Sequence, residues 1–159
     1  MKKDTASNNY AYTLIELLIG ISIISIIFSI GFASYRDFSR RQALTGVTKK
    51  IVSDLRTLQQ KALAGEKPTD CTTLDGYKIN ISSGSYSLYA DCSSDIFLDT
   101  VDLTEDGVTL TSTPVNTITF KVLGQGTNLT SVETITITNT KIDKSTVITV
   151  GIGGDIYSE

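Results

Sequence analysis

Apolar and polar positions follow three different patterns along this chain, and each pattern predicts a different element. Residues 12–35 are apolar almost without interruption, with no charged residue and no proline between Leu17 and Ser34. A helix rises about 1.5 Å per residue, so about 20 such residues span the roughly 30 Å hydrocarbon core of a membrane. The pattern predicts a single transmembrane helix over this stretch.

In residues 36–64 the apolar positions recur every three or four residues, which is the period of one helix face. Gly65 is suited to end a helix, and Pro68 follows shortly after it. We therefore expect the helix to continue to Ala64 and to offer one face to a folded domain. The apolar positions are Leu44, Val47, Ile51, Leu55, Leu58 and Ala62.

From residue 65 to residue 159 the period changes to two, which is typical of strands with one buried face. Residues 76–81 and 85–90 alternate in this way on either side of a Ser-Ser-Gly turn. We expect an α+β fold, in which a long N-terminal helix packs by its outer half on an antiparallel sheet or small sandwich. Further strands are expected at residues 108–112, 115–123, 132–138, 146–150 and 155–157.

The first eleven residues are polar and carry Lys2 and Lys3. In an ordinary secretory signal the small residue of the cleavage site follows the apolar stretch, whereas here Ala11 precedes it. The two lysines favour a cytoplasmic N-terminus, which places the residues after Tyr35 outside the cytoplasm.

Glu16 is a carboxylate just inside the apolar stretch. A charge there costs roughly 2.5–3.5 kcal/mol at the centre of a membrane helix, and less near the interface. One interpretation is an interfacial side chain that reaches the lipid headgroups. The other is a carboxylate that meets a positive partner, such as the amine created on a neighbouring helix by a cut before Tyr12.

The run Ala11-Tyr12-Thr13-Leu14-Ile15-Glu16-Leu17-Leu18 resembles the prepilin processing motif of type IV pilins and type II secretion pseudopilins. The resemblance implies that a prepilin peptidase cuts after Ala11 and methylates Tyr12. It also implies that Glu16 pairs with the terminal amine of an adjacent subunit during assembly. Ala11 and Tyr12 stand where the family usually has Gly and Phe, and the apolar stretch has no proline.

The resemblance further implies a single-pass membrane precursor with its C-terminal domain outside the cytoplasm, which later joins an extracellular or periplasmic filament. Its partners would be homologous pilin or pseudopilin subunits, the peptidase and, before assembly, the membrane. The helix from Asp54 to Leu63 and the closing Gly154-Asp155-Ile156 look most like the H-type minor branch. The expected divisions are a leader at 1–11, an assembly helix at 12–35, an amphipathic extension at 36–64 and a β-domain at 65–159.

Cys71 and Cys92 are the only two cysteines, and the chain has no histidine. A zinc site is therefore disfavoured, and outside the cytoplasm two such cysteines most simply form a disulfide. Closing a loop of about 22 residues stabilises a fold by roughly 3 kcal/mol in the chain-entropy model. Two buried thiols are the alternative.

Acidic residues gather at Asp91, Asp95, Asp99 and Asp102, in what the pattern indicates is a loop. Some pseudopilins bind calcium, and carboxylates in a loop are suitable ligands, so these four residues are the candidates. Their spacing does not match an EF-hand, and a solvated acidic loop is the favoured interpretation. We expect no other cofactor.

Composition narrows the function classes. Without histidine, and without any visible set of nucleophile, acid and base, the sequence argues against an enzyme. The net charge is −3 and no Lys or Arg follows Lys144, which argues against nucleic acid as a partner. The leading hypothesis is a filament subunit. The alternative is a membrane-anchored extracellular binding module, such as a minor pilin at a filament tip that captures DNA or a surface.

Overall fold

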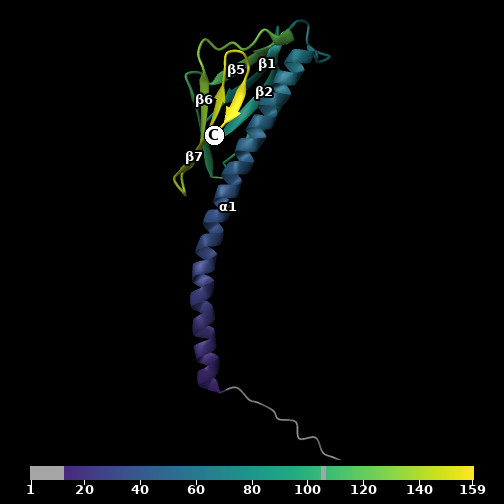
Figure 1. Cartoon of the computed structure of the whole chain (residues 1–159). Helices are drawn as coiled ribbons and strands as arrows, with labels where there is room; N and C mark the ends of the chain where they lie inside the picture. The colour runs from purple at the N-terminus through teal and green to yellow at the C-terminus, as the bar shows by residue number, and fades with distance from the viewer. Residues whose placement is uncertain (1–12, 105–106) are drawn as a thin grey trace, which may run out of the picture. The chain divides into compact units, whose positions relative to one another are not determined.

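A computed structural model of the chain describes residues 13–104 and 107–159 (Figure 1). By their contacts the residues form two compact units, Met1–Phe38 and Ser39–Glu159. The elements are α1 (Leu14–Ala64), β1 (Leu74–Ile81), β2 (Ser85–Cys92), β3 (Ile96–Asp102), β4 (Val108–Thr113), β5 (Thr117–Lys121), the 3-10 turn η1 (Val122–Gly124), β6 (Glu133–Asn139), β7 (Lys144–Val150) and β8 (Ile156–Ser158).

In the second unit, one face of α1 packs against the strands (Figure 1). This face is the predicted apolar stripe from Leu44 to Ala62, and all six of its side chains are at most 6% exposed. Fully burying a large apolar side chain stabilises a fold by about 1.5–3 kcal/mol, so this stripe is what holds the helix to the strands.

The helix ends where the sequence predicts its stop. Gly65 has a φ of +62°, which a residue without a Cβ adopts at no steric cost. Its N–H donates to the Ala62 carbonyl and the Glu66 N–H donates to the Lys61 carbonyl, each at 3.1 Å. This pair of bonds is a Schellman motif, and it satisfies two of the carbonyls that a helix end leaves without partners.

The described strands form two four-stranded antiparallel sheets, ordered β3-β2-β1-β5 and β4-β6-β7-β8. Alternate residues of each inner strand point inward, for example Ile135 and Ile137 of β6, both 0% exposed. They join the helix stripe in one hydrophobic cluster. The α+β fold predicted from the change of period is confirmed.

Two predictions about the strands were wrong. Residues 96–102 form the edge strand β3 rather than part of an acidic loop. Only Ile96 and Val101 in this strand are partly buried. Because neither face of the strand is fully covered, its sequence does not alternate between apolar and polar residues. The strand expected at 115–123 is shorter, because β5 ends at Lys121 and Leu123 turns the chain with a φ of +56°.

A buried carboxylate holds the connection between β4 and β5. Glu133 at the start of β6 is 0% exposed. Its Oε1 lies 2.6 Å from the Ser112 hydroxyl, and its Oε2 accepts the Val115 N–H at 3.1 Å. Burying a carboxylate is costly unless it accepts hydrogen bonds, and here the connection supplies them.

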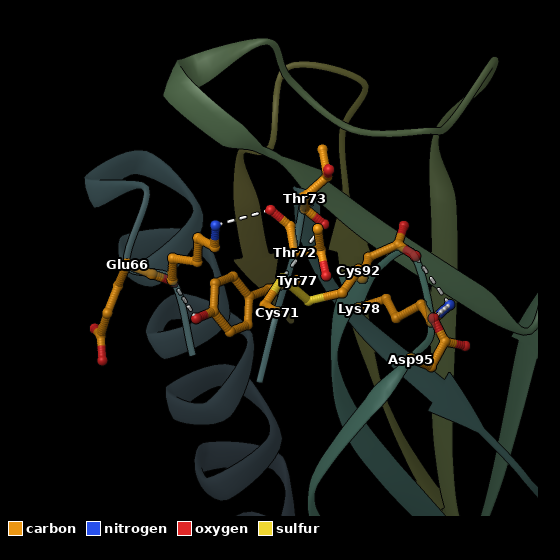
Figure 2. Close-up of a disulfide and its surroundings, with 10 residues drawn as sticks. Glu66, Cys71, Thr72, Thr73, Tyr77, Lys78, Cys92 and Asp95 are labelled. Carbon is orange, nitrogen blue, oxygen red and sulfur yellow. Dashed lines mark hydrogen bonds and ion pairs between the residues drawn. A yellow bond between two sulfur atoms is a disulfide. The ribbon is translucent and has the colours of Figure 1, made fainter. Parts of the chain in front are cut away.

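The predicted disulfide is present. Cys71 and Cys92 are bonded, with their Cα atoms 5.7 Å apart, so the segment after α1 is tied to the end of β2 (Figure 2). The same segment is fastened by two further bonds in Figure 2. The Tyr77 hydroxyl donates to the Glu66 carbonyl, and the Lys67 ammonium donates to the Thr72 carbonyl at 2.8 Å.

Two polar contacts also join α1 to the strands. The buried Tyr86 of β2 donates its hydroxyl to Asp54 Oδ2 at 2.6 Å, and Gln59 Nε2 donates to the Gly154 carbonyl at 2.9 Å. Burial of the ring, followed by the hydrogen bond to Asp54, raises the pKa of Tyr86 well above its ordinary value of 10.0.

Removing the disulfide should destabilise the second unit. For the double variant Cys71→Ser/Cys92→Ser, we expect the free energy of unfolding to fall by roughly 3 kcal/mol, because the closed loop no longer restricts the unfolded chain. Urea unfolding of the full chain in detergent measures this change. Unaltered stability in the double variant would contradict it.

Tyr86 should also make the fold sensitive to high pH. Tyr86 loses its proton near pH 10 in the unfolded chain but keeps it in the folded protein. Above pH 10 the folded state therefore binds one proton more than the unfolded state does. The free energy of unfolding should therefore fall as pH rises above 10, with Tyr86 contributing at most about 1.4 kcal/mol per pH unit.

Urea unfolding between pH 8 and pH 11 measures this slope. Tyr86→Phe should flatten it, and Tyr157→Phe is the matched control, because Tyr157 is 62% exposed. If the free energy of unfolding depends on pH equally in the two variants, Tyr86 does not contribute to the pH dependence.

Candidate assembly site on the apolar helix

The helix begins with a polar cap directly before the apolar run. The Thr13 hydroxyl oxygen accepts the backbone N–H of Glu16 at 3.3 Å, and α1 starts at Leu14. Thr at the cap with Glu three residues later has the spacing of a capping box, in which such a side chain satisfies an otherwise unpaired helix N–H. Ala11 and Tyr12, where processing is predicted, lie outside the described residues.

Past this cap, large apolar side chains cover α1 on every side as far as Tyr35. Each is at least 51% exposed, and the 18-residue stretch that is most apolar has no buried residue. In the described residues α1 is the one helix long and apolar enough to cross a membrane. Its exposed apolar side chains are Leu14, Ile15, Leu17, Leu18, Ile19, Ile21, Ile23, Ile24, Ile26, Ile27, Phe28, Phe32 and Tyr35.

Three serines within this stretch carry their own hydrogen-bond partners. The hydroxyls of Ser22 and Ser25 donate to the carbonyls four residues earlier at 2.9 and 2.8 Å, and Ser29 does the same at 2.8 Å. A hydroxyl bonded within its own helix can enter hydrocarbon without leaving a donor unsatisfied. The serines are therefore compatible with a membrane or with a dry contact between helices.

Glu16 differs from these serines. Its side chain forms no hydrogen bond or ion pair with any described residue. It is also the one charged residue between Leu14 and Tyr35. An ionised carboxylate in hydrocarbon is stable only with a partner or with access to the headgroups, so this position needs something that the described chain does not supply.

The C-terminal end of the stretch is bounded by aromatic and basic residues. The guanidinium of Arg36 lies 5.9 Å from the centre of the Phe32 ring, which is within the range of a cation–π contact. Just before it, a shallow apolar groove of about 390 Å³ runs past Gly31, where an added Cβ would meet nothing within 4 Å. A second helix can approach closely at such a glycine.

The four aspartates proposed as calcium ligands are not gathered into one site. Asp91 and Asp95 both bind the ammonium of Lys78, at 3.1 and 2.7 Å (Figure 2). Asp99 accepts its neighbour's N–H, and Asp102 accepts both the N–H and the hydroxyl of Thr104. Among the described residues no group of three or more His, Cys, Asp or Glu side chains is arranged to hold a metal.

The prokaryotic N-terminal methylation motif matches residues 6–32. No curated protein matches the chain in sequence.

Solved structures with a similar fold include those of two proteins. The type IV minor pilin FimU of Pseudomonas aeruginosa is 16% identical with a TM-score of 0.58, and the match covers 77% of this chain and 92% of that one. The minor pseudopilin EpsH of the Vibrio cholerae type 2 secretion system is 11% identical with a TM-score of 0.56, covering 73% and 95%. The chain therefore carries the prokaryotic N-terminal methylation motif and has a fold similar to those of a type IV minor pilin and a minor pseudopilin.

Proposed function

We propose that the chain is a structural subunit of a type IV pilus-like or type II secretion pseudopilus filament. A prepilin peptidase removes the leader at residues 1–11 by cutting between Ala11 and Tyr12, and methylates the new N-terminus. Residues 12–35 then leave the bilayer and pack among the same helices of neighbouring subunits. Residues 36–64 carry the β-domain at 65–159 on their apolar stripe.

The apolar surface of α1 is the observation that carries this proposal. Its side chains are exposed on all sides, and each would cost about 1.5–3 kcal/mol to move from an apolar environment into water. Lipid tails are as apolar as leucine, so transfer from the bilayer to a bundle of like helices costs these side chains little. A filament core built from such helices is therefore a second stable environment for this segment.

Glu16 then sets the stagger between neighbouring helices. Two unit charges about 4 Å apart attract by roughly 4 kcal/mol at an effective dielectric constant of about 20. That attraction is large enough to offset the 2.5–3.5 kcal/mol, roughly, that a carboxylate costs in a membrane helix. The amine at Tyr12 of an adjacent subunit supplies the positive charge.

Replacing Glu16 should impair assembly without preventing membrane insertion. For Glu16→Gln, we expect the fraction of subunit in sheared filaments to fall by at least about tenfold, the ratio that roughly 1.4 kcal/mol supplies. Immunoblots of filament and membrane fractions, from cells with the assembly machinery, measure both quantities.

Thr13→Ala is the control, because it removes the cap of the same helix turn and keeps the carboxylate. It should retain most of the wild-type incorporation. Normal incorporation of Glu16→Gln would contradict the role in stagger.

A further inference from the structure

Each sheet of the second unit has two edge strands in the described part of the chain, and two of these four edges, β3 and β8, differ in their surroundings. In one sheet β3 pairs only with β2, and in the other β8 pairs only with β7. An open edge presents backbone N–H and C=O groups that can pair with a strand of another chain. The surroundings of the two edges are opposite in charge.

The β8 edge borders a basic groove. A hollow of about 480 Å³ lies between β8 and a polar face of α1, with Ser158 on one side and Lys49, Val52, Ser53, Arg56 and Thr57 on the other. Lys49 and Arg56 are two helix turns apart, or roughly 10 Å. Both are exposed, and neither forms an ion pair or side-chain hydrogen bond with a described residue.

The β3 edge is acidic. Asp99 and Asp102 lie within this strand and Asp95 immediately precedes it, with Lys78 as the basic residue bound nearby. Asp99 pairs in register with Leu88, which packs on the core, so Asp99 lies on the helix-facing side of its sheet. Five of the seven residues of β3 are exposed, so the strand is accessible along most of its length.

We propose that the groove beside β8 binds the β3 edge of a second copy of this chain. The proposal rests on the proposed function, because it names a contact between the β-domains of neighbouring subunits. Charge selects this pairing. Two β3 edges would repel each other through their carboxylates, and two grooves would repel each other through Lys49 and Arg56. A groove and a β3 edge carry opposite charges and attract each other.

The geometry of such a contact suits a filament. The groove and the β3 edge are different surfaces of the same chain, so the contact is heterologous. Each subunit binds one neighbour through its groove and another neighbour through its β3 edge. A heterologous contact that does not close into a ring generates an open helical assembly. Without a partner, the aspartates of β3 instead protect the edge from unspecific pairing.

Carbodiimide crosslinking tests the contact directly, because it joins an amine to a carboxylate that touches it. Full-length chains, one population labelled with ¹⁵N and one unlabelled, are mixed in detergent micelles, crosslinked and analysed by peptide mass spectrometry. We expect a crosslink between Lys49 of one chain and Asp99 of the other. Absence of this intermolecular crosslink overturns the proposal.

Charge variants show whether the groove is responsible. Arg56→Glu should lower the yield of the Lys49–Asp99 crosslink by about fivefold or more, since it replaces an attraction by a repulsion. Lys144→Glu makes the same charge change on β7, outside the groove, and should leave the yield unaltered. Equal yields in the two variants overturn the proposal.

Two further measurements separate the alternatives. Glu16→Gln should leave the crosslink in micelles intact, so a failure of the role of Glu16 in filaments and a failure of the β-domain contact are distinguishable.

A fluorescent single-stranded oligonucleotide tests whether the groove binds a polyanion instead. Binding that depends on Arg56, in the absence of the Lys49–Asp99 crosslink, would assign the groove to a polyanion and overturn the proposal.

Discussion

The apolar surface of α1 between Leu14 and Tyr35 is the constraint on which the rest of the account depends. Its side chains are exposed on all sides of the helix, and exposing such an apolar surface to water is unfavourable. The hydroxyls of Ser22, Ser25 and Ser29 are bonded within the helix, so both lipid and a bundle of like helices are compatible with them. Such a segment is stable only where a membrane or another apolar surface covers it.

The two units differ in how completely they satisfy their own groups. In the unit Ser39–Glu159 a single core, a disulfide and bonded acids such as Glu133 and Asp54 complete the fold from within. Glu16 in the other unit has no described partner. Buried or membrane-embedded charges are stable only when paired, so the partner of Glu16 belongs to another molecule in our account.

Periodicity was sufficient to predict the fold, because the helix stripe and the inner strands each bury one face. It failed at β3, an edge strand in which five of the seven residues are exposed and whose aspartates resemble those of a loop. It also gave no sign of Glu133, whose buried carboxylate stands in a row of apolar positions and is explained only by the distant Ser112 and Val115. The cap at Thr13 could have been predicted, since Thr with Glu three residues later is a local pattern.

Processing at the N-terminus is the central claim, because a subunit that keeps its leader has no amine at Tyr12 for a neighbour's Glu16. The most direct test is the intact mass and N-terminal sequence of the protein recovered from cells that contain a prepilin peptidase. Our account predicts a chain that begins at Tyr12 and carries one added methyl group. A chain that still begins at Met1 would contradict it and would leave a simple membrane anchor with an exported β-domain.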